Sequence, residues 1–417
     1  MTKHLIYFDG LLDIHAGGPS GYLANLKEGF DNIATSYKEN IYWYTGERKD
    51  LIHNDTVAHM PKNKHFILKI KKYILDYVSK YKYFKNFMEL HKNYKNLCVK
   101  DEVYDYLVEK EISTIHCNYI LDLIKIKNIL NKKNNKNIKL YLTTHCPESH
   151  AIEFGNLFKE MGYCKYVVKK VRTLWSEIEK YGYNCADGFI YPSEEALEPY
   201  FQTISNFKEL IKNKDIKYFQ TGVKALISNK SKQELREFYN IPDDKAIIVY
   251  IGRHNEVKGY DVLTRAAKKI LGKRKDVVFL IGGKQSKNIH PPKNKNWKEL
   301  GWVNSADLMR VADLFVLPNK RTFFDLILLE AMSMGTPVIA SSTGGNKTVS
   351  KTTNSLILFD SSQKDLIKKI NEFLELDKEN KEMISNNILE AYSKNYTPEH
   401  FAMIYIDLIN DINKNIT

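Results

Sequence analysis

Residues 319–345 read NKRTFFDLILLEAMSMGTPVIASSTGG and contain the pattern that decides the fold. An apolar helix, predicted for residues 324–334, carries a single carboxylate at Glu330 and ends at a Gly-Thr-Pro turn. A short apolar strand at residues 314–317 precedes the helix, and another at residues 338–340 follows it. Strand, helix and strand form one parallel βαβ unit. Because α/β sheets bind ligands at the carboxyl ends of their strands, the polar residues before this helix are candidate ligand contacts.

The length and composition fit a two-domain α/β protein. The 417 residues exceed what one ordinary hydrophobic core serves, and 43% of them are hydrophobic, which is enough for buried sheets. No run of about 18 apolar residues occurs, so the sequence predicts no membrane span. The N-terminal stretch MTKHLIYFDGLLD has a short apolar core interrupted by Asp9, which favours a buried strand over a signal peptide.

Charge and cysteine usage narrow the partners and the compartment. Lysine and arginine number 63 against 50 acidic residues, which gives a net charge of +13. Such an excess favours a polyanionic partner: a nucleic acid, an anionic lipid surface or a phosphorylated small molecule. The five cysteines are scattered without a CxxC pair, which favours a reducing cytoplasm and disfavours a disulfide framework or a zinc site.

Strands and helices alternate along the whole chain. The first half has predicted strands at residues 5–8, 41–44, 113–116, 140–144 and 188–193. The second half has them at residues 246–251, 277–281, 302–303, 314–317, 338–340 and 355–359, with a short strand at 218–219 beside the boundary. A polar, lysine-rich stretch separates the halves. We therefore expect an N-terminal domain of residues 1–205 and a C-terminal domain of residues 206–395, with parallel sheets facing an interdomain cleft.

Two features of the first half are candidate ligand contacts. Gly17 and Gly18 stand before a predicted helix, where free N–H groups can approach an anion. A flexible turn between strand and helix is the alternative interpretation. His145 follows the strand at residues 140–144, where it can reach a ligand in the cleft or serve as a structural residue.

The second half has a candidate diphosphate site. Arg253 and Lys258 lie in a turn that begins at Gly252, directly after a strand. A guanidinium can hold a diphosphate by bidentate hydrogen bonds, and an ammonium can hold it as a point charge. Glu330 can accept hydrogen bonds from the hydroxyls of a ribose. The chain has no GxxxxGK[ST] motif, which disfavours ATP hydrolysis of the P-loop type.

Residues 64–95 form a basic and aromatic segment. Lysines alternate with tyrosines and phenylalanines, and the acidic residues are confined to Asp76 and Glu89. The apolar residues recur at helical spacing, which predicts an amphipathic helix. Such a helix suits an anionic membrane surface. The alternative is a helix that packs its apolar stripe on the domain and leaves its lysines in solvent.

Together these motifs resemble those of retaining glycosyltransferases with the GT-B fold, of the family 4 type. The strongest matches are Gly252-Arg253 with Lys258-Gly259, ADLFVLP at residues 312–318, and LEAM, GTPVIA and GG within residues 329–345. The first half matches more loosely, at Gly17-Gly18, His145 and Thr221-Gly222-Val223. The resemblance therefore covers the whole chain in order and is strongest in the second half.

The resemblance implies a fold, a reaction and a set of site residues. The fold is two Rossmann-like domains, with a last helix in residues 396–417 that crosses back to the first domain. The reaction moves a sugar from a nucleoside diphosphate sugar to a glycan or lipid-linked acceptor, with retention, at the front face, and with neither a metal nor another cofactor. The implied catalytic residues are Arg253, Lys258, His145 and Asp325. The implied donor-binding residues are Gly17, Gly18, Gly252, Trp302, Val303, Thr322, Phe324, Leu326 and Glu330.

Three positions depart from the family pattern. Thr322 stands where the family has a glutamate eight residues before Glu330, Asp325 replaces a glycine, and Thr348 stands where a glutamate is common. The nucleotide side of the site is therefore intact, and the sugar side is rewritten. Asp325 is a candidate to replace the missing glutamate as an acceptor for sugar hydroxyls, and an unusual donor sugar is the alternative.

Two other functions stand beside this one. The chain could be a catalytically inactive partner or regulatory subunit that still binds nucleotide, although the retention of Arg253, Lys258 and Glu330 disfavours this. Nucleic-acid binding through residues 64–95 would show a steep salt dependence, but no RNA or DNA module accompanies the segment and no nucleic-acid partner is expected. We expect a cytoplasmic protein that associates with the inner face of the plasma membrane.

Overall fold

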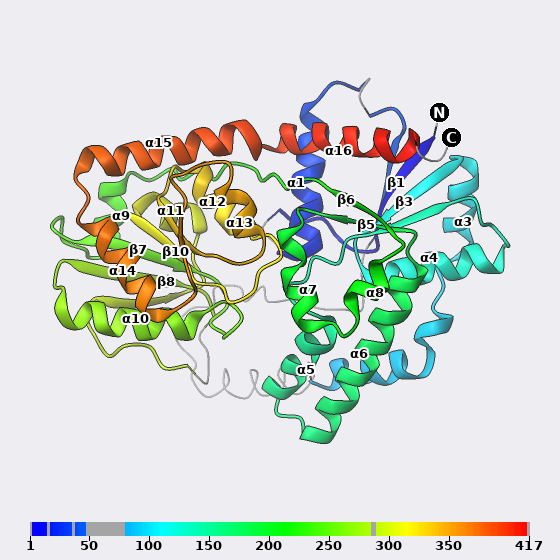
Figure 1. Ribbon diagram of the computed structural model, residues 1–417, viewed down its shortest axis with the longest axis horizontal. Coiled ribbons are helices and arrows are strands. Elements are labelled where there is room, and N and C mark those ends of the chain that lie inside the picture. Colours follow the sequence, from blue (N-terminus) through cyan, green and yellow to red (C-terminus); the bar gives the residue numbers. More distant parts are fainter. Residues whose placement is uncertain (1, 15–16, 36–37, 47–79, 285–288, 415–417) are drawn as a thin grey trace, which may run out of the picture.

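Two parallel sheets in separate lobes form the framework of the protein (Figure 1). The computed structural model describes residues 2–14, 17–35, 38–46, 80–284 and 289–414. Side by side, the strands of the first sheet are β2 (Ile41–Thr45), β1 (Lys3–Phe8), β3 (Ile112–Cys117), β4 (Lys139–Leu142), β5 (Gly188–Tyr191) and β6 (Asp215–Tyr218). Those of the second are β12 (Ile357–Phe359), β11 (Val338–Ser341), β10 (Leu314–Leu317), β7 (Ala246–Ile251), β8 (Val277–Gly282) and β9 (Trp297–Gly301). The predicted α/β architecture with two parallel sheets is confirmed.

Helices surround both sheets. Those of the first domain are α1 (Gly18–Asn32), α3 (Asp101–Glu109), α4 (Ile120–Lys132), α5 (His150–Glu160), α6 (Lys165–Cys185), α7 (Glu198–Thr203) and α8 (Phe207–Ile211), with the short 3-10 turns η2 (Tyr94–Asn96) and η3 (Glu195–Leu197). Those of the second are α9 (Lys232–Phe238), α10 (Tyr260–Lys273), α11 (Ser305–Val311), α12 (Leu326–Ser333), α13 (Gly345–Ser350), α14 (Gln363–Leu374) and α15 (Lys378–Asn395).

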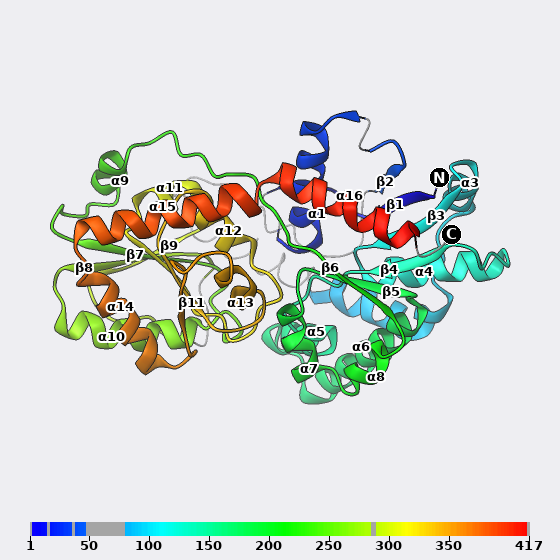
Figure 2. The same cartoon turned by 45° about the horizontal axis from the view of Figure 1, so that its top comes forward.

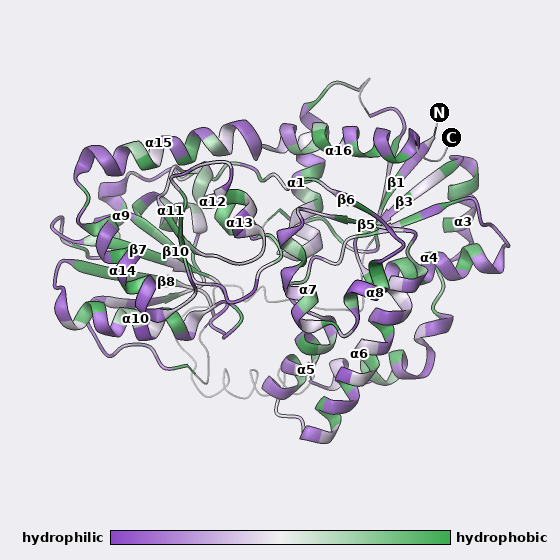
Figure 3. Ribbon diagram, viewed as in Figure 1, coloured by the Kyte–Doolittle hydropathy of each residue, from purple (hydrophilic) through white to green (hydrophobic). Residues whose placement is uncertain are grey.

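The central strands are apolar on both faces because helices cover both faces of each sheet. β7 reads AIIVYI and β8 reads VVFLIG, and every residue of β8 is buried. Such unbroken apolar runs are typical of parallel sheets, in contrast to the alternating pattern of half-exposed antiparallel ones. Figure 3 shows hydrophobic strands inside each domain and mixed surfaces on the surrounding helices.

The first sheet continues beyond the expected domain boundary after residue 205. β6 pairs in parallel with β5, from Gly188 opposite Asp215 to Tyr191 opposite Tyr218. Residues up to Tyr218 therefore belong to the first sheet. The lysine-rich composition suggested a linker, but α8 buries Phe207 and Ile211 in the hydrophobic core of the first domain.

Two further elements differ from the sequence-based expectation. The strand expected at residues 302–303 is β9, which ends at Gly301 and buries Trp297 against Phe279. The helix expected from residue 324 begins at Leu326, because Asp325 has the extended backbone of an N-cap (φ −84°, ψ 112°). Residues 321–325 therefore form a loop, and this loop lies at the centre of the candidate site.

The last helix, α16 (Pro398–Lys414), lies on the first domain, whereas α15 lies on the second (Figure 2). Thr397 Oγ1 accepts a hydrogen bond from the His400 amide (3.3 Å) at the start of α16. A Cβ on Gly29 of α1 would lie 1.9 Å from the Pro398 carbonyl oxygen, so glycine permits the close approach of α1 and α16. Burial of Phe401 and Tyr405 in the apolar cluster on this face of the first sheet then fixes the crossover.

No helix within the described ranges is both long and apolar enough to cross a bilayer.

Candidate active site

The turn after β7 presents the Arg253 side chain to solvent. The Tyr250 hydroxyl donates to the Arg253 carbonyl oxygen (2.8 Å), and a Cβ on Gly259 would lie 1.6 Å from the Pro318 carbonyl oxygen. The turn is thus held against the end of β10. The Arg253 side chain is 61% exposed, and its nearest acidic group is Glu153 of the first domain at 3.9 Å. Its guanidinium is therefore available to an anionic ligand.

Lys258 comes from the same turn but is already paired. Its Nζ lies 2.5 Å from Asp325 Oδ1, and the two side chains are only 20% and 10% exposed. Asp325 also accepts hydrogen bonds from the Asn319 amide and the Thr322 hydroxyl. The carboxylate that replaces the family's glycine thus holds together β10, α12 and the Lys258 turn.

Glu330 differs from Asp325 in having no ion-pair partner among the residues that the structure describes. It lies on α12 in a partly buried position. Burial raises the pKa of its carboxyl group from 4.5 to about 7. A partly desolvated carboxylate gains most from ligand hydroxyls that donate to it.

The glycine loop of the first domain is open. Gly17 is the N-cap of α1, and Gly18 has a left-handed backbone (φ 65°). Apart from chain neighbours, no atom of the described residues lies within 4 Å of the position that a Cβ would take on either glycine. Because neither glycine has a side chain, a ligand can approach the backbone here closely.

His145 packs against Tyr22 of α1, the helix that follows this loop. The centroids of the two rings are 4.4 Å apart. His145 Nε2 lies 2.9 Å from Asn118 Oδ1, and Asn118 Nδ2 donates to the His116 carbonyl oxygen (3.3 Å). The Asn118 oxygen is therefore the acceptor, which places the proton of a neutral His145 on Nε2. Burial and then the neighbouring His116 lower the pKa of His145 well below its usual value.

The other predicted donor-binding residues lie in three places. Trp302 follows β9 with 65% of its surface exposed, and Val303 packs beside the second core near Gly282. Phe324 and Leu326 pack at the start of α12, with the Phe324 ring next to Gly345. Gly252 lies in the turn that carries Arg253, where the Gly283 backbone approaches its carbonyl group.

Thr322 and Thr348, which stand where the family has glutamates, form hydrogen bonds to other protein side chains. Thr322 is buried and donates to Asp325. Thr348 Oγ1 lies within hydrogen-bond distance of two oxygens of the first domain, Ser193 Oγ (2.6 Å) and Glu195 Oε2 (2.9 Å). At these two positions, structural contacts replace the carboxylates that the resemblance implies.

Sequence reasoning missed the contacts that join the domains beside this site. Glu198 accepts from the Gly344 amide (3.0 Å) and pairs with Lys347, and Glu195 pairs with Lys351. Glu195 and Glu198 belong to none of the motifs found in the sequence. Nothing in their spacing identifies partners more than 140 residues away.

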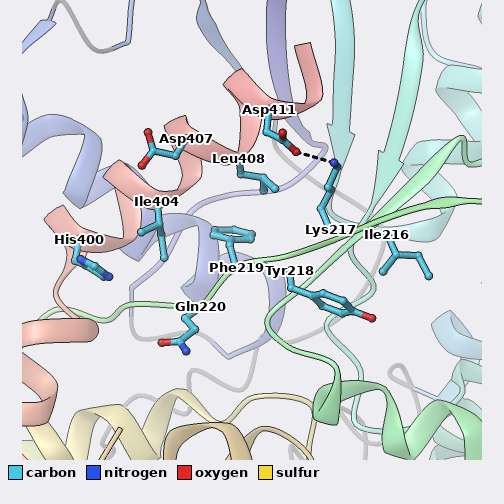
Figure 4. A pocket seen from close by; sticks show the side chains of 10 residues that line it. All are labelled: Ile216, Lys217, Tyr218, Phe219, Gln220, His400, Ile404, Asp407, Leu408 and Asp411. Atoms are coloured by element: carbon cyan, nitrogen blue, oxygen red, sulfur yellow. Dashed lines mark hydrogen bonds and ion pairs between the residues drawn. The ribbon is translucent and has the colours of Figure 1, made fainter. Parts of the chain in front are cut away.

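A separate hollow lies between β6 and α16, where Lys217 of β6 pairs with Asp411 of α16 (Figure 4). None of the predicted site residues lines it. Among the side chains that the structure describes, no group of three or more His, Cys, Asp or Glu is arranged to hold a metal ion.

The second domain is similar in sequence to known proteins. The family model described as glycosyl transferases group 1 matches residues 231–389. D-inositol 3-phosphate glycosyltransferase 2 of Catenulispora acidiphila is 29% identical over 133 residues, which are 27% of this chain and 31% of that protein. The corresponding enzyme of Mycolicibacterium smegmatis is 30% identical over 129 residues, which are 28% of this chain and 29% of that protein. The chain thus spans less than a third of the length of these relatives.

Solved structures match the whole fold. Sucrose-phosphate synthase from Thermosynechococcus elongatus aligns over 99% of both chains with a TM-score of 0.61 and 17% identity. Anabaena HepE, solved in complex with UDP and glucose, aligns over 98% of this chain and 100% of its own with a TM-score of 0.58 and 14% identity. The chain therefore has the GT-B fold, and its residues 231–389 match the family model of the group 1 glycosyl transferases.

Proposed function

We propose that the protein is a retaining glycosyltransferase that moves a sugar from a nucleoside diphosphate donor to a glycan acceptor without a metal ion. Two features of the second domain carry the proposal. The Arg253 guanidinium is exposed, and the Glu330 carboxylate has no ion-pair partner in the described part of the chain. The group 1 family match supports it. So does the structural neighbour HepE, which was solved in complex with UDP-glucose.

In this reaction the bond from the sugar C1 to the diphosphate oxygen breaks, and a bond from C1 to the acceptor oxygen forms on the same face. The acceptor proton passes to the departing phosphate oxygen, so no protein nucleophile is needed. Arg253 and Lys258 stabilise the charge that develops on the diphosphate, an effect that typically contributes about 3 kcal/mol per donor. Glu330 holds the ribose.

His145 is proposed to contact the donor sugar. Its protonated Nε2 is held by Asn118, so Nδ1 is the atom with a lone pair available to accept from a sugar hydroxyl. Because burial keeps the imidazole neutral, it can act as a hydrogen-bond acceptor throughout the neutral pH range.

The acceptor is proposed to be a lipid-linked glycan at an anionic membrane surface. Residues 64–79 of the basic segment lie outside the described residues. The helix that follows, at residues 80–93, packs through Phe84 and Phe87 on Tyr163 and Phe158 of the first domain. Tyr81 remains 64% exposed. Part of the segment therefore packs on the domain, as its alternative interpretation predicted, while an aromatic side chain is left for an interface.

Vesicle flotation tests the membrane proposal. We expect the protein to float with vesicles that contain anionic lipid and to remain behind with neutral ones, because each lysine near an anionic surface contributes about 1 kcal/mol. Equal partitioning onto both kinds of vesicle would contradict it.

A panel of nucleoside diphosphates and their sugars, measured by thermal shift, tests the donor proposal. We expect one base to raise the unfolding midpoint, and its sugar conjugate to be turned over. If no member of the panel binds or reacts, the proposal fails.

A nucleotide-binding subunit without catalysis is the second candidate function. The engagement of Thr322, Asp325 and Thr348 in structural contacts favours it, since these positions face the sugar in the family pattern. Binding of a nucleotide sugar without release of nucleoside diphosphate, in the presence of a range of acceptors, would support it over the enzyme.

A further inference from the structure

The loop between β10 and α12 faces two domains at once. Its alternate residues point in opposite directions, as in an extended segment. Thr322 contacts Asp325 in its own domain. Arg321 and Phe323, on either side of it, contact the first domain.

Arg321 reaches a buried carboxylate. Its Nη2 lies 2.8 Å from Oε2 of Glu148, whose side chain is only 4% exposed. Burial raises the pKa of Glu148, and the Arg321 guanidinium acts in the opposite direction. A carboxylate so far from solvent depends on this cation, because a buried charge that loses its partner is strongly destabilising.

Phe323 is buried in the hydrophobic core of the first domain, although it belongs to the second. Its ring lies edge-on to Tyr191 (6.2 Å) and is tilted toward Tyr200 (5.9 Å). It also meets the His145 ring edge-on, with the centroids 6.2 Å apart.

The two contacts hold the two ends of one short loop. His145 and Glu148 are three residues apart after β4, and Phe323 touches the first while Arg321 touches the second. His145 has a left-handed backbone (φ 54°), which is strained for a residue other than glycine and persists only when its surroundings impose it. Tyr22, Asn118 and Phe323 surround its ring, and only Phe323 comes from the second domain.

We infer that Arg321 and Phe323 are positioning residues that make the orientation of His145 depend on the docking of the two domains. The inference rests on the proposed function, in which His145 contacts the donor sugar. The same loop reaches Lys258 through Thr322 and Asp325. One segment thus sets the sugar contact of the first domain relative to the diphosphate contacts of the second.

The substitution Phe323→Leu tests this, with Phe207→Leu as the matched control. Phe207 is also a buried aromatic of the first core and also packs on Tyr200 (5.4 Å), but its recorded ring contacts do not include His145. We expect Phe323→Leu to lower kcat by about tenfold through misplacement of His145, with the Kd for the nucleoside diphosphate changed less than about twofold. Phe207→Leu should lower the unfolding midpoint and leave kcat unchanged.

Histidine-selective NMR gives a readout that does not require turnover. The His145 imidazole signals, assigned with a His145→Gln variant, should shift in Phe323→Leu and stay in place in Phe207→Leu. If the wild-type protein turns over no donor, the proposed function fails while this shift still tests the positioning role. Equal kcat losses in both variants, or an unmoved His145 signal in Phe323→Leu, would overturn the inference.

Arg321→Gln provides a second variant, should Phe323→Leu not fold. Arg321 is 30% exposed, and Glu148, whose pKa burial already raises, can take up a proton when the guanidinium is removed, so that no buried charge is left without a partner. We expect a smaller loss of kcat, about threefold, and a smaller shift of the His145 signals in the same direction. No shift of those signals would contradict the part assigned to Arg321.

Discussion

The nucleotide side and the sugar side of the candidate site differ in how far their polar groups are already engaged. On the nucleotide side, Arg253 is largely exposed and Glu330 has no ion-pair partner within the described residues. On the sugar side, Thr322 and Asp325 are joined to each other and to Lys258. On one side the polar groups are not engaged with each other, and on the other they are joined to each other within the second domain.

The difference shows where a short motif is enough to predict the surroundings of a side chain and where it is not. The groups proposed for the nucleotide side are placed by single strand–helix turns, so local sequence is enough to predict their position. The groups proposed for the sugar side, Thr322 and Asp325, are held by contacts between two loops of the second domain. Their neighbours Arg321 and Lys347 reach Glu148 and Glu198 of the first domain, which lie far away in the chain.

The largest expected effect comes from removing the exposed cation. Arg253→Ala should lower kcat by about a hundredfold or more, because a donor aimed at the charge of the leaving group typically contributes about 3 kcal/mol. The stabilisation by nucleoside diphosphate should fall with it. Steady-state kinetics and thermal shift measure the two effects.

Arg310→Ala is the matched control, since Arg310 is exposed on α11 and outside the site. It should change neither quantity. Activity retained in Arg253→Ala would show that the nucleotide side does not carry the reaction, and would remove the contrast between the two sides.

Much of the fold could be predicted from the sequence, whereas the roles of the candidate site residues stay predictions. β7 was predicted with its exact bounds because a β-branched run closed by Gly252 has few other interpretations. β6 was assigned to the wrong half because strand pairing is a tertiary property and its lysine-rich surroundings resemble a linker. Asp325 was expected to face a sugar, whereas its binding to Lys258 depends on two turns meeting, which no local pattern encodes.

The next largest effect is expected at the Lys258–Asp325 ion pair. Asp325→Asn keeps the shape of the side chain but leaves Lys258 without its counter-charge in a largely buried position. We expect a loss of about 2 kcal/mol, since breaking a buried pair leaves an uncompensated charge, and a fall in the unfolding midpoint of about 5 °C. Nucleoside diphosphate should then stabilise the variant more than the wild type, because it supplies the missing anion. Differential scanning calorimetry with and without the nucleotide measures both.

Asp313→Asn provides the comparison, because Asp313 forms a similar 2.5 Å pair with Lys232 away from the site. It should lower the midpoint without changing the response to nucleotide. If both variants respond alike, the Lys258–Asp325 pair has no special relation to the ligand.

The contribution of Glu330 to stability should depend on pH. Its folded-state pKa of about 7 lies above its ordinary value of 4.5, so the folded protein holds this proton more tightly than the unfolded chain does. The protonated group favours folding at low pH, and that advantage is lost as the pH rises through about 7. Glu330→Gln should therefore be more stable than the wild type at pH 8 and nearly equal to it at pH 5.

The same substitution should weaken nucleoside diphosphate binding at pH 8 by about fivefold, because a hydrogen bond to a charged acceptor contributes about 1 kcal/mol more than one to a neutral acceptor. Calorimetric titration at the two pH values measures this. Glu379→Gln, an exposed change on α15, is the control. A stability difference that does not depend on pH would contradict the burial of Glu330, and an unchanged Kd would contradict its contact with the ribose.

The smallest effect is expected at the ion pair between Lys351 of the second domain and Glu195 of the first. Burial opposes the charge of Glu195, but Lys351, the local backbone and Thr348 outweigh it and lower its pKa to about 2. Lys351 itself is 67% exposed. A double-mutant cycle of Lys351→Met and Glu195→Gln should thus give a coupling free energy of about 0.5 kcal/mol, reduced further by salt. The exposed pair of Lys368 and Glu372 within α14 is the control, and its coupling should be no larger. A coupling of several kcal/mol at the Lys351 pair would mean that this contact, rather than Arg321 and Phe323, dominates the docking of the domains beside the sugar side.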